Sequence, residues 1–189
     1  HPYDLYASLE NSVRSGDESV SKKVILSADS CCDLNEELLR RYEVNRIHPT
    51  ILLEGKEYTD CVDIFPEDLY KAYWERGVMP KTTAINTGEY LDYFRKWTEQ
   101  GYEVVHLCIG SGFSACYQYC RLAAEELGGV YPVDTRNLSG GVGLLTVEAG
   151  KRIAEGKPAG QVAEEVTELT SKVQCSFILD TLDFMRAGG

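Results

Sequence analysis

No stretch of this chain approaches the roughly 20 consecutive apolar residues that a membrane-spanning helix needs. Basic residues are also scarce: 19 Lys and Arg face 30 Asp and Glu, which gives a net charge of −11. Such a surface repels nucleic acid phosphates and excludes DNA or RNA as an expected partner. No basic start followed by an apolar core marks a signal peptide, so we expect a cytoplasmic protein. The first residue, His1, indicates an excerpt or a processed product.

Metal ligands in a recognisable pattern are missing as well. The seven cysteines contain no C-x-x-C pair, and no neighbouring histidine completes a zinc set around Cys116 and Cys120, which are one helical turn apart. Their odd number and their placement inside expected strands and helices predict free, reduced and buried thiols. The sequence therefore predicts neither a metal site nor a cofactor.

What is present suits one α/β domain with room for a short extra segment. The chain has 189 residues, of which 43% are hydrophobic. Residues 1–22 form an N-terminal extension, in which Leu5, Leu9 and Val13 could line one face of a short helix before a polar linker. From residue 23 to residue 189, strands and helices alternate, which is typical of a mostly parallel sheet with helices on both faces.

The expected elements follow from apolar runs, helical spacing and turn residues. They are strands over 24–27, 45–53, 104–109, 130–133 and 176–179, helices over 36–42, 66–76, 87–100, 116–127, 141–155 and 159–172, and a short amphipathic stretch over 181–186. Asp33 or Asn35 is expected to cap the first of these helices, and Glu54-Gly55 to form the turn that ends the second strand. A loop is expected over 79–86.

The stretch from Gly110 to Ser114 joins an apolar strand to an amphipathic helix through small and hydroxylated residues. The first N–H groups of a helix have no internal acceptor, so a carboxylate or a phosphate is favoured there. Ligands of open α/β sheets bind beyond the carboxyl ends of the strands. The polar loops at 29–30, 82–83, 111–114 and 134–139 are therefore candidates for one shared site, although Ser111 or Ser114 could also simply cap the helix.

Several motifs, taken in order over residues 23–189, resemble the DegV family of bacterial fatty-acid-binding proteins. They are Ala-Asp-Ser at 28–30, Tyr-Thr-Asp at 58–60, Pro-Lys-Thr-Thr at 80–83, Ser-Ala-Cys-Tyr-Gln at 114–118, Asp-Thr at 134–135 with Ser-Gly at 139–140, and Thr-Leu-Asp-Phe-Met at 181–185 with Gly-Gly at 188–189. Ala115 and Cys116 replace the family's glycine and threonine, so one hydroxyl is lost there.

The resemblance implies a Rossmann-like, non-catalytic protein that holds one long-chain fatty acid such as palmitate between two domains. By the family's pattern, Thr82 and Ser114 bind the carboxylate, with Ser111, Thr83 and Ser30 as secondary candidates. Some members present the lipid to a fatty acid kinase, which is the implied protein partner. The family's second α/β domain, with a histidine near the head group, would lie beyond Gly189 and is absent from this chain.

Other functions stay open at this point. A serine hydrolase acting on acyl esters would use Ser111 or Ser114, but only His1, His48 and His106 could serve as its base. A nucleotide- or phosphate-binding module would lack both common glycine-rich phosphate motifs. A pure interaction domain, peripheral contact with a membrane and the oligomeric state are also left undecided.

Overall fold

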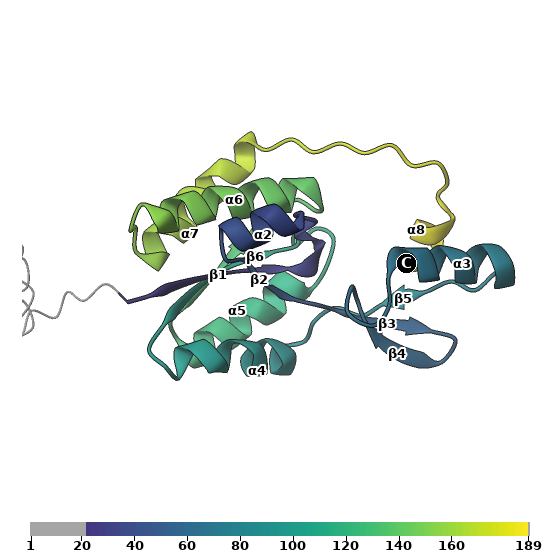
Figure 1. Cartoon of the computed structure of the whole chain (residues 1–189), viewed down its shortest axis with the longest axis horizontal. Helices are drawn as coiled ribbons and strands as arrows, with labels where there is room; N and C mark the ends of the chain where they lie inside the picture. The colour runs from purple at the N-terminus through teal and green to yellow at the C-terminus, as the bar shows by residue number, and fades with distance from the viewer. Residues whose placement is uncertain (1–21, 189) are drawn as a thin grey trace, which may run out of the picture.

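The computed structural model describes residues 22–188, so the expected N-terminal helix and linker lie outside the described residues. An α/β layered body is joined to a smaller antiparallel sheet, which lies beside the carboxyl end of the main sheet (Figure 1). The expected α/β fold with helices on both faces of a parallel sheet is confirmed. No helix within 22–188 has the length and hydrophobicity of a membrane span.

The main sheet consists of four parallel strands in the order β2-β1-β6-β7. Their bounds are Val24–Asp29 for β1, Asn45–Ile47 for β2, Glu103–Cys108 for β6 and Val130–Asp134 for β7. Successive side chains point to opposite faces. Leu26, Ala28 and Val105 join one buried cluster, whereas Ile25, Val104 and Cys108 join the other. Both faces are covered, which explains the nearly continuous apolar runs.

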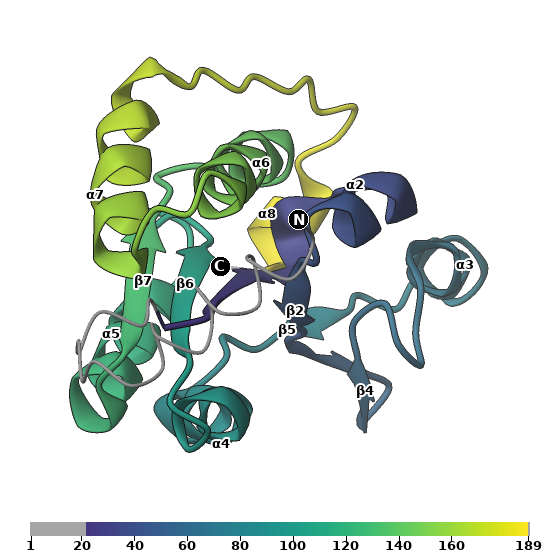
Figure 2. The ribbon, with the colours of Figure 1, turned by 60° about the vertical axis from the view of Figure 1, so that its left-hand side comes forward.

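Helices cover both faces of this sheet (Figures 1 and 2). On one face lie α2 (Glu36–Arg41), α6 (Gly140–Ala154) and α7 (Ala159–Leu169); on the other lie α4 (Thr87–Thr98) and α5 (Cys116–Leu127). Short 3₁₀ turns, η1 (Ser30–Cys32) and η2 (Thr170–Lys172), follow β1 and α7. Asn35, not Asp33, caps α2 by accepting a hydrogen bond from the N–H of Leu38.

The single strand expected over 45–53 is wrong. The chain forms β2, leaves the parallel sheet at His48-Pro49 and begins β3 (Thr50–Leu53) in a separate antiparallel sheet with β4 (Lys56–Thr59) and β5 (Lys81–Thr82). Pro49 has no N–H to donate to a ladder, so it favours the break. Glu54 and Gly55 both have positive φ and form the expected turn after Leu53, which joins β3 to β4 in a hairpin.

The helix α3 (Pro66–Arg76) covers the small sheet. Ile51, Leu53, Ile64 and Ala72 form its buried cluster. β5 pairs with β3, with Thr82 opposite Ile51. The expected loop over 79–86 is therefore partly a strand, which holds the two threonines beside the main sheet.

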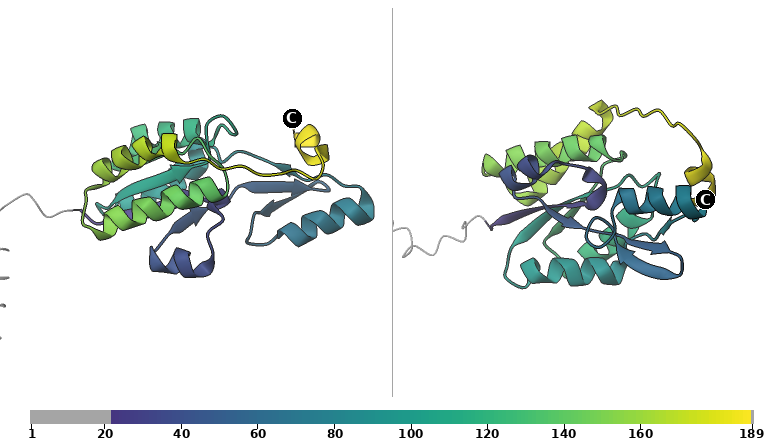
Figure 3. Two further views of the ribbon diagram at one scale, coloured as in Figure 1. Left: turned by 90° about the horizontal axis from the view of Figure 1, so that it is seen from above. Right: turned by 45° about the vertical axis from the view of Figure 1, so that its right-hand side comes forward.

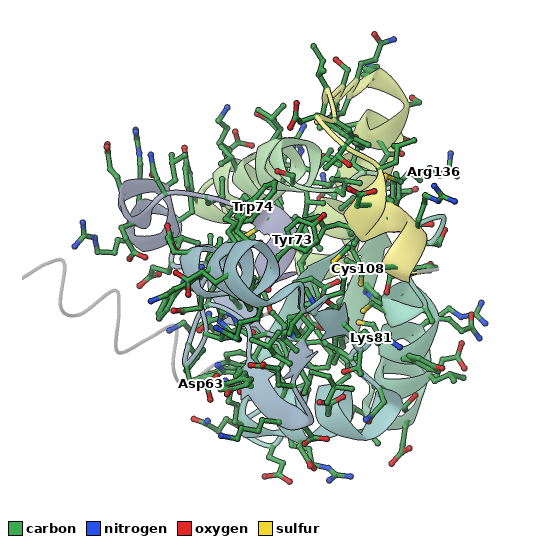
Figure 4. All side chains as sticks on the ribbon, turned by 90° about the vertical axis from the view of Figure 1, so that its right-hand side faces the viewer. Asp63, Tyr73, Trp74, Lys81, Cys108 and Arg136 are labelled. Atoms are coloured by element: carbon green, nitrogen blue, oxygen red, sulfur yellow. The ribbon has the colours of Figure 1, made fainter. Side chains whose placement is uncertain are left out.

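The strand expected over 176–179 is also wrong. Ile178 is fully exposed, Phe177 and Leu179 are about half exposed, and no strand among residues 22–188 pairs with this segment. It crosses from α7 to α3 as an extended connection (Figure 3). An apolar run becomes a strand only where another strand satisfies its backbone. The amphipathic stretch that follows forms α8 (Asp183–Gly188), whose Phe184 packs on Tyr73 of α3. Tyr73 is labelled in Figure 4.

Candidate functional site

A pocket of about 470 Å³ lies between the carboxyl ends of β1 and β6 and the small antiparallel sheet. Thr82, Thr83, Ser30 and Ser114 all line it. Three of the four candidate loops therefore meet at one site. The apolar part of its wall comes from Pro49, Ile51, Leu69, Ala84, Ile85, Ile109 and Phe113.

Ser114 lies two residues before Cys116, the first residue of α5. Its Oγ accepts a hydrogen bond from the N–H of Cys116 at 3.2 Å and donates to the Cys116 sulfur at 3.1 Å. A thiol sulfur is a weak acceptor. A carboxylate in the pocket could replace the sulfur as the acceptor of the Ser114 hydroxyl at little cost in free energy. The free N–H groups of the first helical turn add partial positive charge there.

Both threonines are exposed: Thr82 ends β5 of the small sheet, and Thr83 follows it. Thr83 donates its hydroxyl to the carbonyl of Thr50 at 3.3 Å, a long bond, and its own N–H reaches the same oxygen at 3.0 Å. The hydroxyl of Thr82 makes no hydrogen bond to another described residue. Thr82 is therefore the more available donor of the pair.

The hydroxyl of Ser30 already has a hydrogen-bond acceptor within the protein. Its hydroxyl donates to Oδ2 of Asp60 at 2.9 Å, and both residues line the pocket. Because the single proton of Ser30 goes to Asp60, Ser30 could bind a carboxylate only by giving up this bond. Ser30 is thus the weakest donor among the four candidate hydroxyls of the pocket.

Ser111 does not line the pocket. Its N–H and hydroxyl both donate to Asp134, at 3.0 and 2.6 Å, and Asp134 also accepts from the N–H of Arg136. These bonds tie the loop after β6 to the loop after β7. The fourth candidate loop therefore does not line the pocket but holds the loop after β6 in place. Asp134 bonds its neighbouring loops, as expected.

Sequence reasoning missed a buried polar network beneath the pocket. Asp29, which lines the pocket and is 3% exposed, accepts from Tyr90 at 2.7 Å, from Nε2 of His106 at 2.9 Å and from the N–H of Ile109 at 2.8 Å. The other ring nitrogen, Nδ1 of His106, bonds Ser27 at 2.9 Å, and Ser27 bonds Tyr93. The polar residues Ser27, Asp29 and His106 at alternate positions within apolar strands are the signal that could have revealed it.

His106 carries a shifted pKa. Burial alone lowers it, while the polar contact with the Cys108 sulfur and the hydrogen bond and negative charge of Asp29 raise it, and the resulting pKa is about 9. Burial raises the pKa of the Cys108 thiol well above its usual value, so that thiol stays neutral. Asp29 is therefore the charge that holds the imidazolium.

This pair predicts a pH dependence of stability. A histidine whose pKa rises from 6.5 to about 9 on folding stabilises the protein fully below pH 6.5, and that stabilisation is lost as the pH rises through 9. We expect the urea midpoint to fall between pH 6.5 and 9.5. His106→Gln should remove most of this slope, and equal slopes in both proteins would contradict the assignment.

The thiols are free among the described residues, as expected, and Cys116 and Cys120 are buried, but Cys61 and Cys175 are exposed, contrary to the expectation of buried thiols. One histidine does lie beside the buried thiols, although none is near them in the sequence. Ligand atoms of His106, Cys108 and Cys120 lie within 4.8 Å of one another in the interior, where Cys108 is labelled in Figure 4. The strand pairing and the packing of α5 create this proximity, which no spacing in the sequence reveals. Both ring nitrogens of His106 are already hydrogen-bonded, so the group fits a packed polar core better than a metal site.

Among residues 22–188, neither histidine is placed to act as the base of the hydrolase alternative. His106 is fully buried and bonds Ser27 and Asp29, not the loop after β6. His48 is half-buried between β2 and β3, and burial lowers its pKa. Within residues 22–188, no hydrogen bond joins a histidine to Ser111 or Ser114.

The family model described as "Uncharacterised protein, DegV family" matches residues 23–189. The chain belongs to the DegV family. A DegV domain-containing protein of Clostridium perfringens is 30% identical over 176 residues, which cover 89% of this chain and 60% of that protein. Another from Clostridium acetobutylicum is 28% identical over 170 residues, 89% of this chain and 61% of its own length. The chain thus spans about 60% of the length of these DegV relatives.

Solved DegV structures share this fold. A DegV family protein from Thermus thermophilus, described as fatty acid binding, is 29% identical with a TM-score of 0.77, covering 88% of this chain and 60% of its own. A stearic acid-binding protein from Eubacterium ventriosum is 25% identical with a TM-score of 0.67, covering 77% of this chain and 52% of its own. The expected membership of the DegV family is confirmed.

Proposed function

We propose that this protein binds one long-chain fatty acid, with the carboxylate at the pocket beside the start of α5. The observation that carries the proposal is the meeting of Thr82 and Ser114 at one pocket with a partly apolar wall. The two DegV relatives of known structure described above, which bind fatty acids, support it. Residues 23–189 then form the first domain of a two-domain DegV protein, and the binding is non-catalytic.

The energetics divide between tail and head group. Burying a sixteen-carbon tail at about 0.8 kcal/mol per methylene gives on the order of 10 kcal/mol before the entropy of association is subtracted. Hydrogen bonds to the charged carboxylate contribute roughly 1.5 to 3 kcal/mol each and offset its desolvation. The tail supplies most of the affinity, and the hydroxyls of Thr82 and Ser114 fix the orientation.

Removing one head-group hydroxyl tests the proposal. We expect Ser114→Ala and Thr82→Ala each to raise the Kd for palmitate about tenfold or more, because each loses a charge-assisted hydrogen bond. Equilibrium dialysis of delipidated protein against radiolabelled palmitate measures the Kd.

Ser111→Ala is the matched control, because Ser111 lies in the same loop but bonds Asp134 outside the pocket. Its Kd should stay within about twofold of the wild type, since no hydrogen bond to the carboxylate is lost. Absence of palmitate binding by the wild type, or equal loss in Ser111→Ala and Ser114→Ala, would overturn the proposal.

We further propose that the bound carboxylate is presented to a fatty acid kinase. No lysine or arginine in the described part of the chain lines the pocket. A carboxylate held by neutral hydroxyls therefore keeps an oxygen free to attack the γ-phosphate of ATP, with ADP as leaving group. Incubation of the loaded protein with such a kinase, ATP and hydroxylamine should trap the acyl phosphate as a hydroxamate. Formation of equal hydroxamate without this protein would contradict the carrier role.

A further inference from the structure

We propose that His106 is a positioning residue that lets the pocket accept a carboxylate, by neutralising the buried Asp29 in the pocket wall. The proposal rests on the fatty acid function argued above. It deepens that function by naming what makes the site tolerate an anion.

Asp29 presents a problem for an anionic ligand. It lies in the lining of the same pocket as Ser114 and Thr82, and it is almost completely buried. Three donors bond its two oxygens. At low effective dielectric, an uncompensated charge there would repel a second carboxylate in the pocket.

His106 supplies the compensation. Its Nε2 donates to Oδ1 of Asp29 at 2.9 Å, and neither side chain is more than 4% exposed. Its Nδ1 lies 2.9 Å from the Ser27 hydroxyl oxygen, which can accept a hydrogen bond from a protonated Nδ1 while it donates its own to Tyr93. The buried pair then has no net charge.

The other titratable groups around His106 carry no charge at neutral pH. They come from α4, β6 and α5 and are Tyr90, Tyr93, Cys108 and Cys120; burial raises the pKa of each. The rings of Tyr90 and Phe94 contact the imidazole of His106 edge to face, with ring centroids 5.5 and 5.2 Å from its own. These contacts fix the orientation of the imidazole. Two carboxylates line the pocket: Asp29 is paired with His106, whereas Asp60 accepts the hydroxyl of Ser30. His106 therefore compensates the charge of Asp29 alone.

Ligand charge distinguishes this role from a purely structural one. In the full chain, we compare the Kd for palmitate with that for hexadecanol, a neutral ligand of equal chain length. His106→Gln should raise the Kd for palmitate about tenfold or more and change the Kd for hexadecanol less than about twofold. Only the charged palmitate is repelled by the unpaired charge of Asp29. Asp29→Asn combined with His106→Gln should restore palmitate binding. His48→Gln, at the chain's other described histidine, is the matched control and should change neither ligand.

Equal weakening of both ligands by His106→Gln would reduce His106 to a structural residue and overturn the inference, as would unchanged palmitate binding. Failure of the wild type to bind palmitate would instead overturn the proposed function itself. If the variants do not fold, ¹⁵N NMR of the wild-type imidazole decides the matter. We expect His106 to be protonated on both nitrogens at pH 7, and a neutral ring there would overturn the inference.

Discussion

Replacing Asp29 with alanine is expected to lower the free energy of unfolding by about 3 to 5 kcal/mol, because it leaves a buried charge partner without its counterion. The hydroxyl of Tyr90, the N–H of Ile109 and Nε2 of His106 all lose their acceptor. Part of the loss is recovered when His106 gives up its proton. Urea denaturation at pH 7 measures the change.

Asp134→Ala is the matched control for this prediction. Asp134 also ends a strand and also accepts three hydrogen bonds, but they come from the exposed Ser111 and Arg136. Water can replace these bonds, so we expect a loss of about 1 kcal/mol. Equal losses in the two variants would show that burial of the His106–Asp29 pair does not matter.

Gly110→Ala is expected to destabilise the protein by up to about 3 kcal/mol, because the added methyl group has no room. A Cβ at Gly110 would lie 2.8 to 2.9 Å from backbone atoms of Arg136 and Asn137. The N–H of Gly110 also donates to the carbonyl of Asn137 at 2.8 Å, so the two loops cannot separate without losing that bond. Thermal or urea unfolding measures the loss.

Gly112→Ala, two residues along the same loop, provides the control. Nothing lies within 4 Å of a Cβ at Gly112, so the substitution should change stability by less than about 0.5 kcal/mol. We also expect Gly110→Ala to weaken palmitate binding, because Gly110 accepts the N–H groups of Phe113 and Ser114 and so helps to place Ser114. Normal binding in a destabilised Gly110→Ala protein would separate loop packing from head-group placement.

Local signals predicted the elements whose causes are local. Helix α3 begins at Pro66 and ends before Gly77, which has positive φ, as its sequence predicts. The strand over 176–179 and the single strand over 45–53 failed for the opposite reason. Whether Phe177–Leu179 becomes a strand depends on a pairing partner, and the end of β2 depends on where Pro49 directs the chain.

The candidate site shows the same division. The sequence alone indicated hydroxyls at strand ends, because alternation of strands and helices places those ends at one edge of a sheet. It could not distinguish Ser111 from Ser114 by geometry, since both precede the first residue of α5 by five residues or fewer. Their different partners, Asp134 for one and the Cys116 thiol for the other, depend on the packing of β7 beside β6.

The sequence by itself determined the α/β class, most helix boundaries and the family, because periodicity, caps and short ordered motifs are written along the chain. Tertiary structure alone decided the separate antiparallel sheet, the pocket and the Asp29–His106 pair. The two residues of this pair are 77 positions apart, and only the register of β1 beside β6 sets their 2.9 Å contact. A hydrogen bond across a sheet depends on that register, which no local pattern in either strand encodes.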